Sequence, residues 1–103
     1  MIVVSVMYGT QPDGHFDWDY YNAKHIPLVR DAYGPTGLES IRVLKGMDIP
    51  GGGPAPYVAI ALLGFTDMAA VQASMGGVRT GEVMGDIANF TNIEPLRQIS
   101  EVV

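Results

Sequence analysis

The sequence predicts an α+β fold in which one four-stranded antiparallel sheet carries two helices on one of its faces. Three observations support this prediction. Four segments of strand length are rich in β-branched and aliphatic residues, two segments repeat apolar residues at helical spacing, and the order is β-α-β-β-α-β. The chain has 103 residues, 48% hydrophobic and 17% charged, which is too apolar for a disordered chain. We expect one domain over residues 1–103, since no repeat or linker divides it.

The four expected strands are runs of apolar residues bounded by turn-forming glycine and proline. We place them at Ile2–Tyr8, at Leu38–Lys45, at Tyr57–Phe65 and within Pro95–Val102. The glycine-rich stretch Met47–Pro56 separates the second strand from the third, and we expect it to form a flexible loop.

Each expected helix begins at an aspartate that can accept hydrogen bonds from the free N–H groups of the first turn. Asp17 opens the first helix, which Gly34 and the proline after it bring to an end. Asp67 opens the second helix, over Met68–Met75. A weaker helical segment is expected over Glu82–Ala88.

The order of the elements is that of the ferredoxin-like arrangement, whose helices cover only one face of the sheet. The strands are nevertheless apolar on both faces, as in the third strand, where Ala59, Ala61 and Leu63 alternate with Val58, Ile60 and Leu62. A sheet with one face in water would alternate apolar with polar residues. We therefore expect a homodimer in which the open sheet faces of two copies pack together. The alternative is that the apolar pattern overstates how much of this face is covered.

The charged residues argue against polyanionic partners. The formal net charge is −5. The six basic residues are scattered along the chain: Lys24, Arg30, Arg42, Lys45, Arg79 and Arg97. Binders of nucleic acid or anionic membrane cluster such residues. The longest apolar run, Tyr57–Leu63, is too short to span a bilayer, and the first residues lack the basic region of a signal peptide. We expect a cytoplasmic protein with neither nucleic-acid nor membrane partners.

His25 is the leading candidate for a reactive group. It lies on the core-facing stripe of the first helix, one turn from Tyr21 and nearly one turn from Leu28. Imidazole exchanges protons near neutral pH, and Tyr21 could orient a ligand oxygen or hold the imidazole in one tautomer. Pro27 lacks an N–H, so we expect a kink or a restart of the helix just after His25 that opens space beside it. The alternative is a core histidine bonded to a backbone carbonyl.

Aromatic residues and one carboxylate complete the candidate site. Large rings mostly form plain core. From those in this chain we select Tyr8, Trp18 and Phe90, together with Leu28, as candidates for the lining of a substrate site, whereas Tyr20 falls off the helical stripe. Asp86 is a possible second polar group, with a helix cap or a turn residue as the alternative.

The sequence lacks the usual patterns of metal and nucleotide sites. Cysteine is absent, which excludes disulfides, thiolate catalysis and cysteine-bound metals. His15 and His25 show no metal-ligand spacing, and no acidic pair lies at regular helical spacing from either. The glycines of Gly51–Gly53 do not follow a strand and open a helix, as a dinucleotide-binding motif would. We expect neither a metal nor another cofactor.

Two segments resemble the EthD family. In Phe16–Val29, the residues Tyr20-Tyr21, His25 and Pro27-Leu28 match a pattern carried by the first helix of that family. Gly85–Thr91 is similar to its D-I-x-N-F-T segment. The resemblance implies a dimeric α+β barrel, in which the sheets of two subunits pack face to face. It also implies that Tyr21 and His25 line a pocket, and it adds Asp86 to the candidate site.

The residues and the resemblance favour an enzyme that acts on a small apolar carbonyl, phenol or lactone, with His25 as general acid/base and Tyr21 orienting the substrate. The resemblance implies an isomerase, cyclase, decarboxylase or cofactor-free oxidoreductase, in oxidative catabolism or polyketide-like metabolism. Two alternatives stay open. One is a non-catalytic accessory protein that binds a hydrophobic metabolite for an oxygenase system, and the other is a structural dimer whose histidine belongs to the core.

Overall fold

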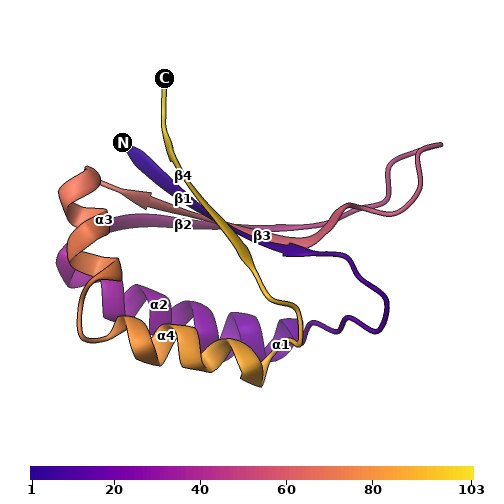
Figure 1. Ribbon diagram of the computed structural model, residues 1–103, viewed down its shortest axis with the longest axis horizontal. Helices are drawn as coiled ribbons and strands as arrows, with labels where there is room; N and C mark the ends of the chain where they lie inside the picture. Colours follow the sequence, from indigo (N-terminus) through magenta and orange to yellow (C-terminus); the bar gives the residue numbers. More distant parts are fainter.

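The computed structural model describes residues 1–103 and confirms the predicted fold class. Its sheet has four strands: β1 (Ile2–Gly9), β2 (Leu38–Lys45), β3 (Tyr57–Phe65) and β4 (Leu96–Glu101). They lie in the order β2-β3-β1-β4, and every neighbouring pair is antiparallel. This is the ferredoxin-like order, and Figure 1 shows the twisted sheet nearly edge-on above the helices.

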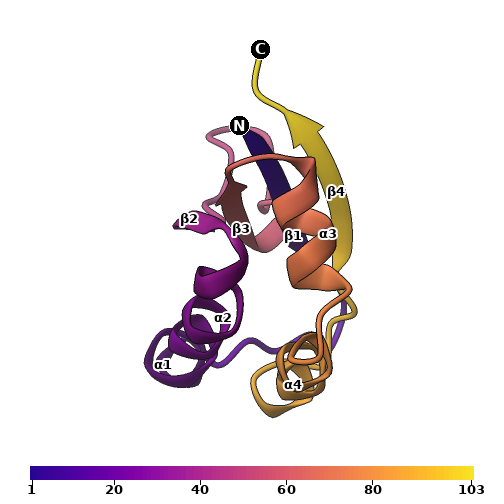
Figure 2. The same cartoon turned by 90° about the vertical axis from the view of Figure 1, so that its left-hand side faces the viewer.

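All helices lie on the same face of the sheet, as Figure 2 shows. The first helical stretch consists of α1 (Trp18–Tyr20), the π-helical turn η1 (Tyr21–His25), α2 (Ile26–Tyr33) and the 3₁₀ turn η2 (Gly34–Thr36). The second consists of α3 (Met68–Met75), α4 (Thr80–Asp86) and the 3₁₀ turn η3 (Ile87–Asn89). α2 and α4 are in contact with one another. None of these helices is long and apolar enough to cross a bilayer.

The predicted helix caps are confirmed. Asp17 Oδ1 accepts a hydrogen bond from the N–H of Tyr20 at 3.0 Å, and Asp67 Oδ1 accepts one from the N–H of Ala70 at 2.8 Å. α2 ends directly before Gly34, as predicted. The left-handed residue that turns the chain into β2 is Gly37, with φ of 112°.

The third helical segment begins earlier than the sequence predicts, at Thr80 rather than at Glu82. Arg79, which precedes it, donates from Nη1 to Asp31 Oδ2 on α2 at 2.7 Å, and also pairs with Glu82. This ion pair links the start of α4 to α2. The helix therefore begins earlier beside a tertiary contact, the ion pair of Arg79 with Asp31, which the local sequence does not reveal.

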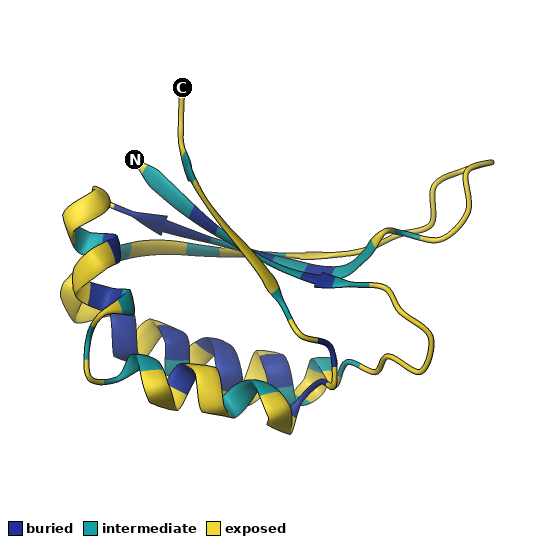
Figure 3. Cartoon of the chain, viewed as in Figure 1, coloured by how far each residue is buried: buried dark blue, intermediate teal, exposed yellow.

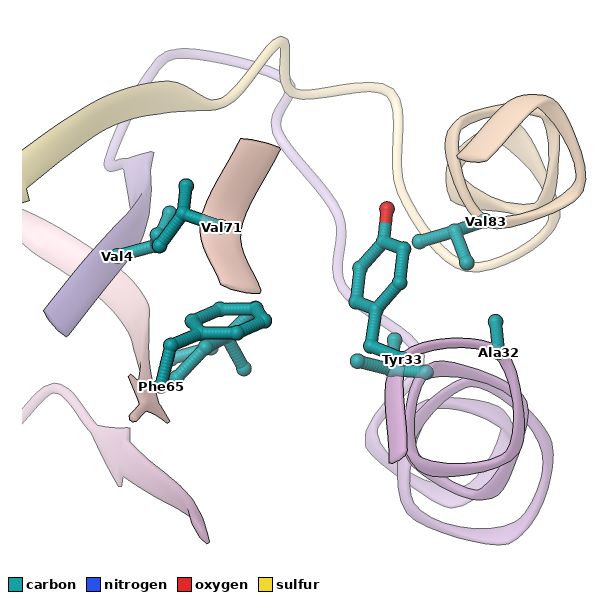
Figure 4. Close-up of a cluster of buried hydrophobic side chains, with 9 residues drawn as sticks. Val4, Ala32, Tyr33, Phe65, Val71 and Val83 are labelled. Carbon is teal, nitrogen blue, oxygen red and sulfur yellow. The ribbon is translucent and has the colours of Figure 1, made fainter. Parts of the chain in front are cut away.

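The core fills the space between the sheet and the helices, and Figure 3 shows buried residues on the inner sides of both. Figure 4 shows one part of it, in which Val4 and Phe65 from the strands face Val71, Tyr33 and Val83 from the helices. A second buried cluster is largely aromatic and includes Tyr8, Tyr21 and Phe90. His25 packs against two rings of this second cluster.

The other face of the sheet has no cover within the chain. Strand alternation and register place these apolar side chains on it: Val3, Met7, Leu44, Ile60, Leu62 and Leu96. None of them is fully buried, and Leu44 and Leu96 are 42% and 60% exposed. An uncovered apolar sheet face is unusual for a chain that acts alone in water.

Candidate active site

A π-helical turn positions the two residues that the sequence singles out as reactive. The N–H of Ile26 donates to the carbonyl of Tyr21 and closes the turn η1. Pro27, in the first turn of α2, has no N–H, so the regular bonding pattern has to change beside it. The predicted restart after His25 is therefore present, in the form of a widened turn. Such turns are frequent at functional sites.

Aromatic packing fixes the orientation of the imidazole. The rings of Tyr21 and His25 are stacked, with centroids 5.5 Å apart and planes inclined by 24°. Phe90 also packs against the imidazole, at 4.6 Å between centroids. His25 is only 4% exposed as a result. A ring enclosed in this way has little rotational freedom.

The partner of His25 is a carboxylate from the other helical stretch. His25 Nδ1 lies 2.9 Å from Asp86 Oδ2, so the turn η1 and the helix α4 together assemble the pair. The bond goes to a charged side chain and not to the backbone carbonyl of the core-histidine alternative. A carboxylate that accepts from Nδ1–H selects the tautomer whose Nε2 carries the lone pair. This is the arrangement that orients a histidine general base.

Asp86 is itself held by two further donors. The hydroxyl of Tyr20 donates to Asp86 Oδ1 at 2.6 Å, and the amide of Asn89 donates to the same oxygen at 2.9 Å. Neither residue was among the site candidates predicted from the sequence. For Asn89 a signal was available, because a position three residues after Asp86 faces the same side of a helical turn. Tyr20 lies off the apolar stripe because it faces α4.

Burial and hydrogen bonding set the charge state of the pair. Burial lowers the pKa of His25 below its ordinary value, against the hydrogen bond and the charge of Asp86. Burial also acts to raise the pKa of Asp86, but the hydrogen bonds from Tyr20, Asn89 and His25 outweigh it and hold that pKa below its ordinary value. At neutral pH the pair therefore consists of a neutral imidazole and a carboxylate.

A cavity lies beside the imidazole, between the sheet and the helices. Val6, Tyr8 and Ala61 line it from the strands, and Tyr21 and His25 line it from the helices. The volume in which the centre of a water molecule fits is about 40 Å³. The whole empty space, including the part of the mouth that is open to solvent, is about 540 Å³. Twelve of its 16 lining residues are hydrophobic. The inner part has room for a few waters, so a larger ligand must also occupy the mouth.

Three polar atoms of the residues that line this cavity have no partner in the chain. Neither His25 Nε2 nor the hydroxyls of Tyr8 and Tyr21 make a hydrogen bond within the protein. No buried side-chain nitrogen or oxygen is left both unpaired and sealed from solvent, so all three atoms are reached through the cavity. Burial raises the pKa of Tyr21 to about 12 and that of Tyr8 further. At neutral pH the cavity thus presents two hydroxyl donors and one imidazole acceptor.

Solved structures identify the family. An EthD-like protein from Ralstonia eutropha JMP134 is 36% identical, with a TM-score of 0.90 over 99% of this chain and 91% of that one. The chain belongs to the EthD family. An ethyl tert-butyl ether degradation family protein from Bacillus halodurans C-125 is 20% identical, with a TM-score of 0.78 over 100% of this chain and 99% of that one. An antibiotic biosynthesis monooxygenase shares the fold at 13% identity, with a TM-score of 0.53 over 100% and 99%. No protein-family model and no curated protein matches the sequence.

Not all of the expected lining residues reach the cavity of this EthD family member. Tyr8, Tyr21 and His25 do. Asp86 and Phe90 lie behind the imidazole, where one binds it and the other packs against it. Trp18 lies outside the cavity and packs on Phe16 and Tyr21, with Lys45 Nζ 5.5 Å from the centre of its ring. Leu28 packs against the larger core cluster instead.

The π-helical turn explains the position of Leu28. A π-helical turn accommodates one extra residue, which rotates the following helix by about 100° relative to an uninterrupted one. The side chains that line the cavity from α2 are consequently Ile26, Val29 and Tyr33. The stripe predicted at constant helical spacing passes through His25, Leu28 and Val29, so it includes Leu28 and omits Ile26.

The donor set of this EthD family member is poor in metal ligands. No group of three or more histidine, cysteine, aspartate or glutamate side chains is placed to hold a metal ion. Nδ1 of His25 already faces Asp86, and the other unpaired polar groups of the lining are two phenol hydroxyls and the guanidinium of Arg97. The arrangement is suited to accepting a proton at Nε2 and to donating hydrogen bonds from the two tyrosines.

Proposed function

We propose that this EthD family protein is an enzyme that moves a proton on a small, largely apolar carbonyl, phenol or lactone, with His25 as general acid/base. One observation supports the proposal most. An unpaired Nε2 faces an apolar cavity, while Nδ1 of the same ring faces an ionised carboxylate. A buried histidine with only a structural role has no need of a free nitrogen in a cavity.

The geometry fits one proton-transfer step. Nε2 of His25 takes the proton from a C–H next to the substrate carbonyl. The electron pair of that bond forms a C=C bond, and the π pair of the carbonyl moves onto its oxygen, which gives an enolate. Asp86 stabilises the imidazolium that forms, and the hydroxyl of Tyr21 donates a hydrogen bond to the new oxyanion. The imidazolium then returns the proton to a different atom of the substrate. Isomerisations and cyclisations of carbonyl compounds begin in this way.

Hydrogen exchange tests this step without knowledge of the natural substrate. In D₂O, the wild-type protein should accelerate loss of the ¹H NMR signal next to the carbonyl in a panel of aryl ketones and unsaturated lactones. We expect His25→Ala and His25→Gln to slow the exchange by about 100-fold or more. His15→Ala is the matched control, because His15 is exposed and makes only backbone hydrogen bonds. Exchange that survives both His25 substitutions in a folded protein would show that His25 is not the base.

A second function fits the predominantly apolar lining of the cavity. The protein could bind a hydrophobic metabolite and present it to an oxygenase system, with His25 serving as a hydrogen-bond partner. The same panel separates the two functions. Compounds that bind at the cavity but show neither exchange nor conversion favour the accessory function.

We further propose that the protein is a homodimer through the open face of its sheet. The apolar side chains on that face have no cover in the chain, and a second copy is the simplest complement. Leu62 lies there on the central strand β3. Leu62→Glu should convert the dimer to a monomer in light-scattering chromatography, whereas Glu39→Gln, at an exposed position on β2, should not. A wild-type protein that is monomeric at micromolar concentration rules the dimer out.

A further inference from the structure

An arginine on the edge strand lies at the mouth of the cavity. Arg97 on β4 pairs in register with Val6 on β1, so their side chains point to the same face of the sheet. Val6 and Tyr8 line the cavity from that face, and Arg97 lines it with them. Arg97 and Met84 are exposed members of the lining, which places both at the opening to solvent.

The charge of Arg97 has no counterpart in the protein. The ion pairs of the structure are those of His25 with Asp86 and of Arg79 with Asp31 and Glu82. None of the 11 acidic residues pairs with Arg97, although the chain is acidic overall.

The single hydrogen-bond contact of the Arg97 side chain joins Nη1 to the sulfur of Met84 at 3.5 Å. A thioether is a weak acceptor, so most of the guanidinium donors stay available to a ligand. Arg79 provides the contrast, because two carboxylates already occupy its donors. Of the two arginines that contact α4, only Arg97 is free to bind an anion at the cavity.

We propose that Arg97 binds the carboxylate of an amphiphilic substrate at the mouth of the cavity, while the apolar part of that substrate extends inward to His25. A guanidinium matches the two oxygens of a carboxylate with two parallel hydrogen bonds. The apolar lining between the mouth and the imidazole suits a ring or a short hydrocarbon body. This proposal rests on the proposed function, and it narrows the substrate to small monocarboxylates.

Electrostatics supports the placement. Burial raises the pKa of Tyr8, and the charge of Arg97 acts on it in the opposite direction, so the guanidinium is close enough to influence the hydroxyl inside the cavity. Tyr8 and Arg97 both line the cavity, so a carboxylate bound to Arg97 lies at the same end of the cavity lining as strand β1. His25 is left for the other end of the molecule.

Benzoate and benzamide are matched probes, because they share a ring and a planar head group but differ in charge. Their binding is measured by NMR titration, with the Cε1–H resonance of His25 as the reporter of the cavity and that of His15 as the internal reference. We expect wild-type protein to bind benzoate about tenfold or more tightly than benzamide. Arg97→Gln should abolish this preference without changing the affinity for benzamide.

Two further variants sharpen the test. Arg97→Lys keeps the charge without the planar fork and should retain a reduced preference for benzoate. Arg30→Gln removes an exposed arginine of α2 that does not line the cavity, and it should leave the preference unchanged. Thermal melts of all variants confirm that they are folded.

The outcomes separate this proposal from the proposed function. If Arg97→Gln keeps the preference for benzoate, or if wild-type protein binds both probes equally, Arg97 is not the anion site although the cavity still binds small molecules. If neither probe shifts the His25 resonance at any soluble concentration, the small-molecule function fails together with the role of Arg97.

Discussion

Replacing Asp86 with asparagine tests the feature on which the site depends, the ionised carboxylate behind His25. Asparagine keeps the size of the side chain and still offers one carbonyl oxygen, so Tyr20 and Asn89 retain an acceptor. The substitution removes the negative charge from the 2.9 Å contact with Nδ1 of His25. Any change in the imidazole can then be attributed to the lost charge and hydrogen bond at Nδ1 rather than to a cavity.

The expected loss of stability follows from the kind of hydrogen bond. A bond to a charged partner contributes about 1.5–3 kcal/mol, against about 0.5–1.5 kcal/mol for a neutral one. His25 is 4% exposed, so solvent screens its side of the contact weakly. We expect Asp86→Asn to lower the free energy of unfolding by about 1–2 kcal/mol at neutral pH. For a chain of this size, that corresponds to a fall in Tm of roughly 4 °C or more.

The same substitution should lower the pKa of His25 further, because it removes the hydrogen bond and the charge that raise it. An NMR titration of the imidazole Cε1–H measures this pKa, with His15 as the exposed reference. Asp48→Asn, at an exposed position in the loop between β2 and β3, is the control for loss of one negative charge. A pKa of His25 that stays the same or rises in Asp86→Asn would refute the pairing of Nδ1 with the carboxylate.

Three further predictions follow from the same geometry. Tyr21→Phe removes a hydroxyl without a partner in the chain, so the free energy of unfolding should change by less than about 1 kcal/mol. Deuterium exchange into the substrate should nevertheless slow by about 100-fold, because the oxyanion loses a hydrogen-bond donor. Acid should abolish exchange with a midpoint below about pH 6.5, because the pKa of His25 is lowered. Stability should fall over the same window, since the unfolded chain there binds a proton that the folded chain lacks, and melts across pH check this. Gly37→Ala should lower the free energy of unfolding by more than about 1 kcal/mol in denaturant titrations, because φ is 112° and the new Cβ would collide with Ala70. Gly34→Ala is the control, because the new Cβ there has open space around it.

Much of the fold could be predicted because its causes are local. β2 and β3 begin and end at the predicted residues, since glycines flank β2, and Pro56 and the helix-capping Asp67 lie on either side of β3. Asp17 and Asp67 cap their helices through bonds to N–H groups three residues ahead, a distance that a short window of sequence covers. The restart of the helix after His25 was predictable for the same reason, because Pro27 lacks an N–H whatever surrounds it.

The candidate site was predictable only in part. His25 and Tyr21 emerge from the sequence because helical spacing places both on the inner face before the π-helical turn. Beyond the turn the same spacing places Leu28 and Val29 on the inner face, whereas the structure presents Ile26 and Val29 to the cavity. Asp86 was a candidate, but its role was assigned to the substrate rather than to the imidazole. Tyr20, Asn89 and Arg97 were not selected at all.

By itself, then, the sequence determined the order of the strands, the bounds of β2 and β3, the helix caps and a histidine on a buried face, because each depends on residues that are neighbours in the chain. The tertiary structure decided the pairing of His25 with Asp86, the cavity beside it and the position of Arg97 at its mouth. These contacts join residues far apart in the chain, and they form only when α4 packs against α2, where Arg79 and Asp31 hold it. Their geometry depends on the packing of the whole layer of helices against the sheet, and no local pattern carries that information.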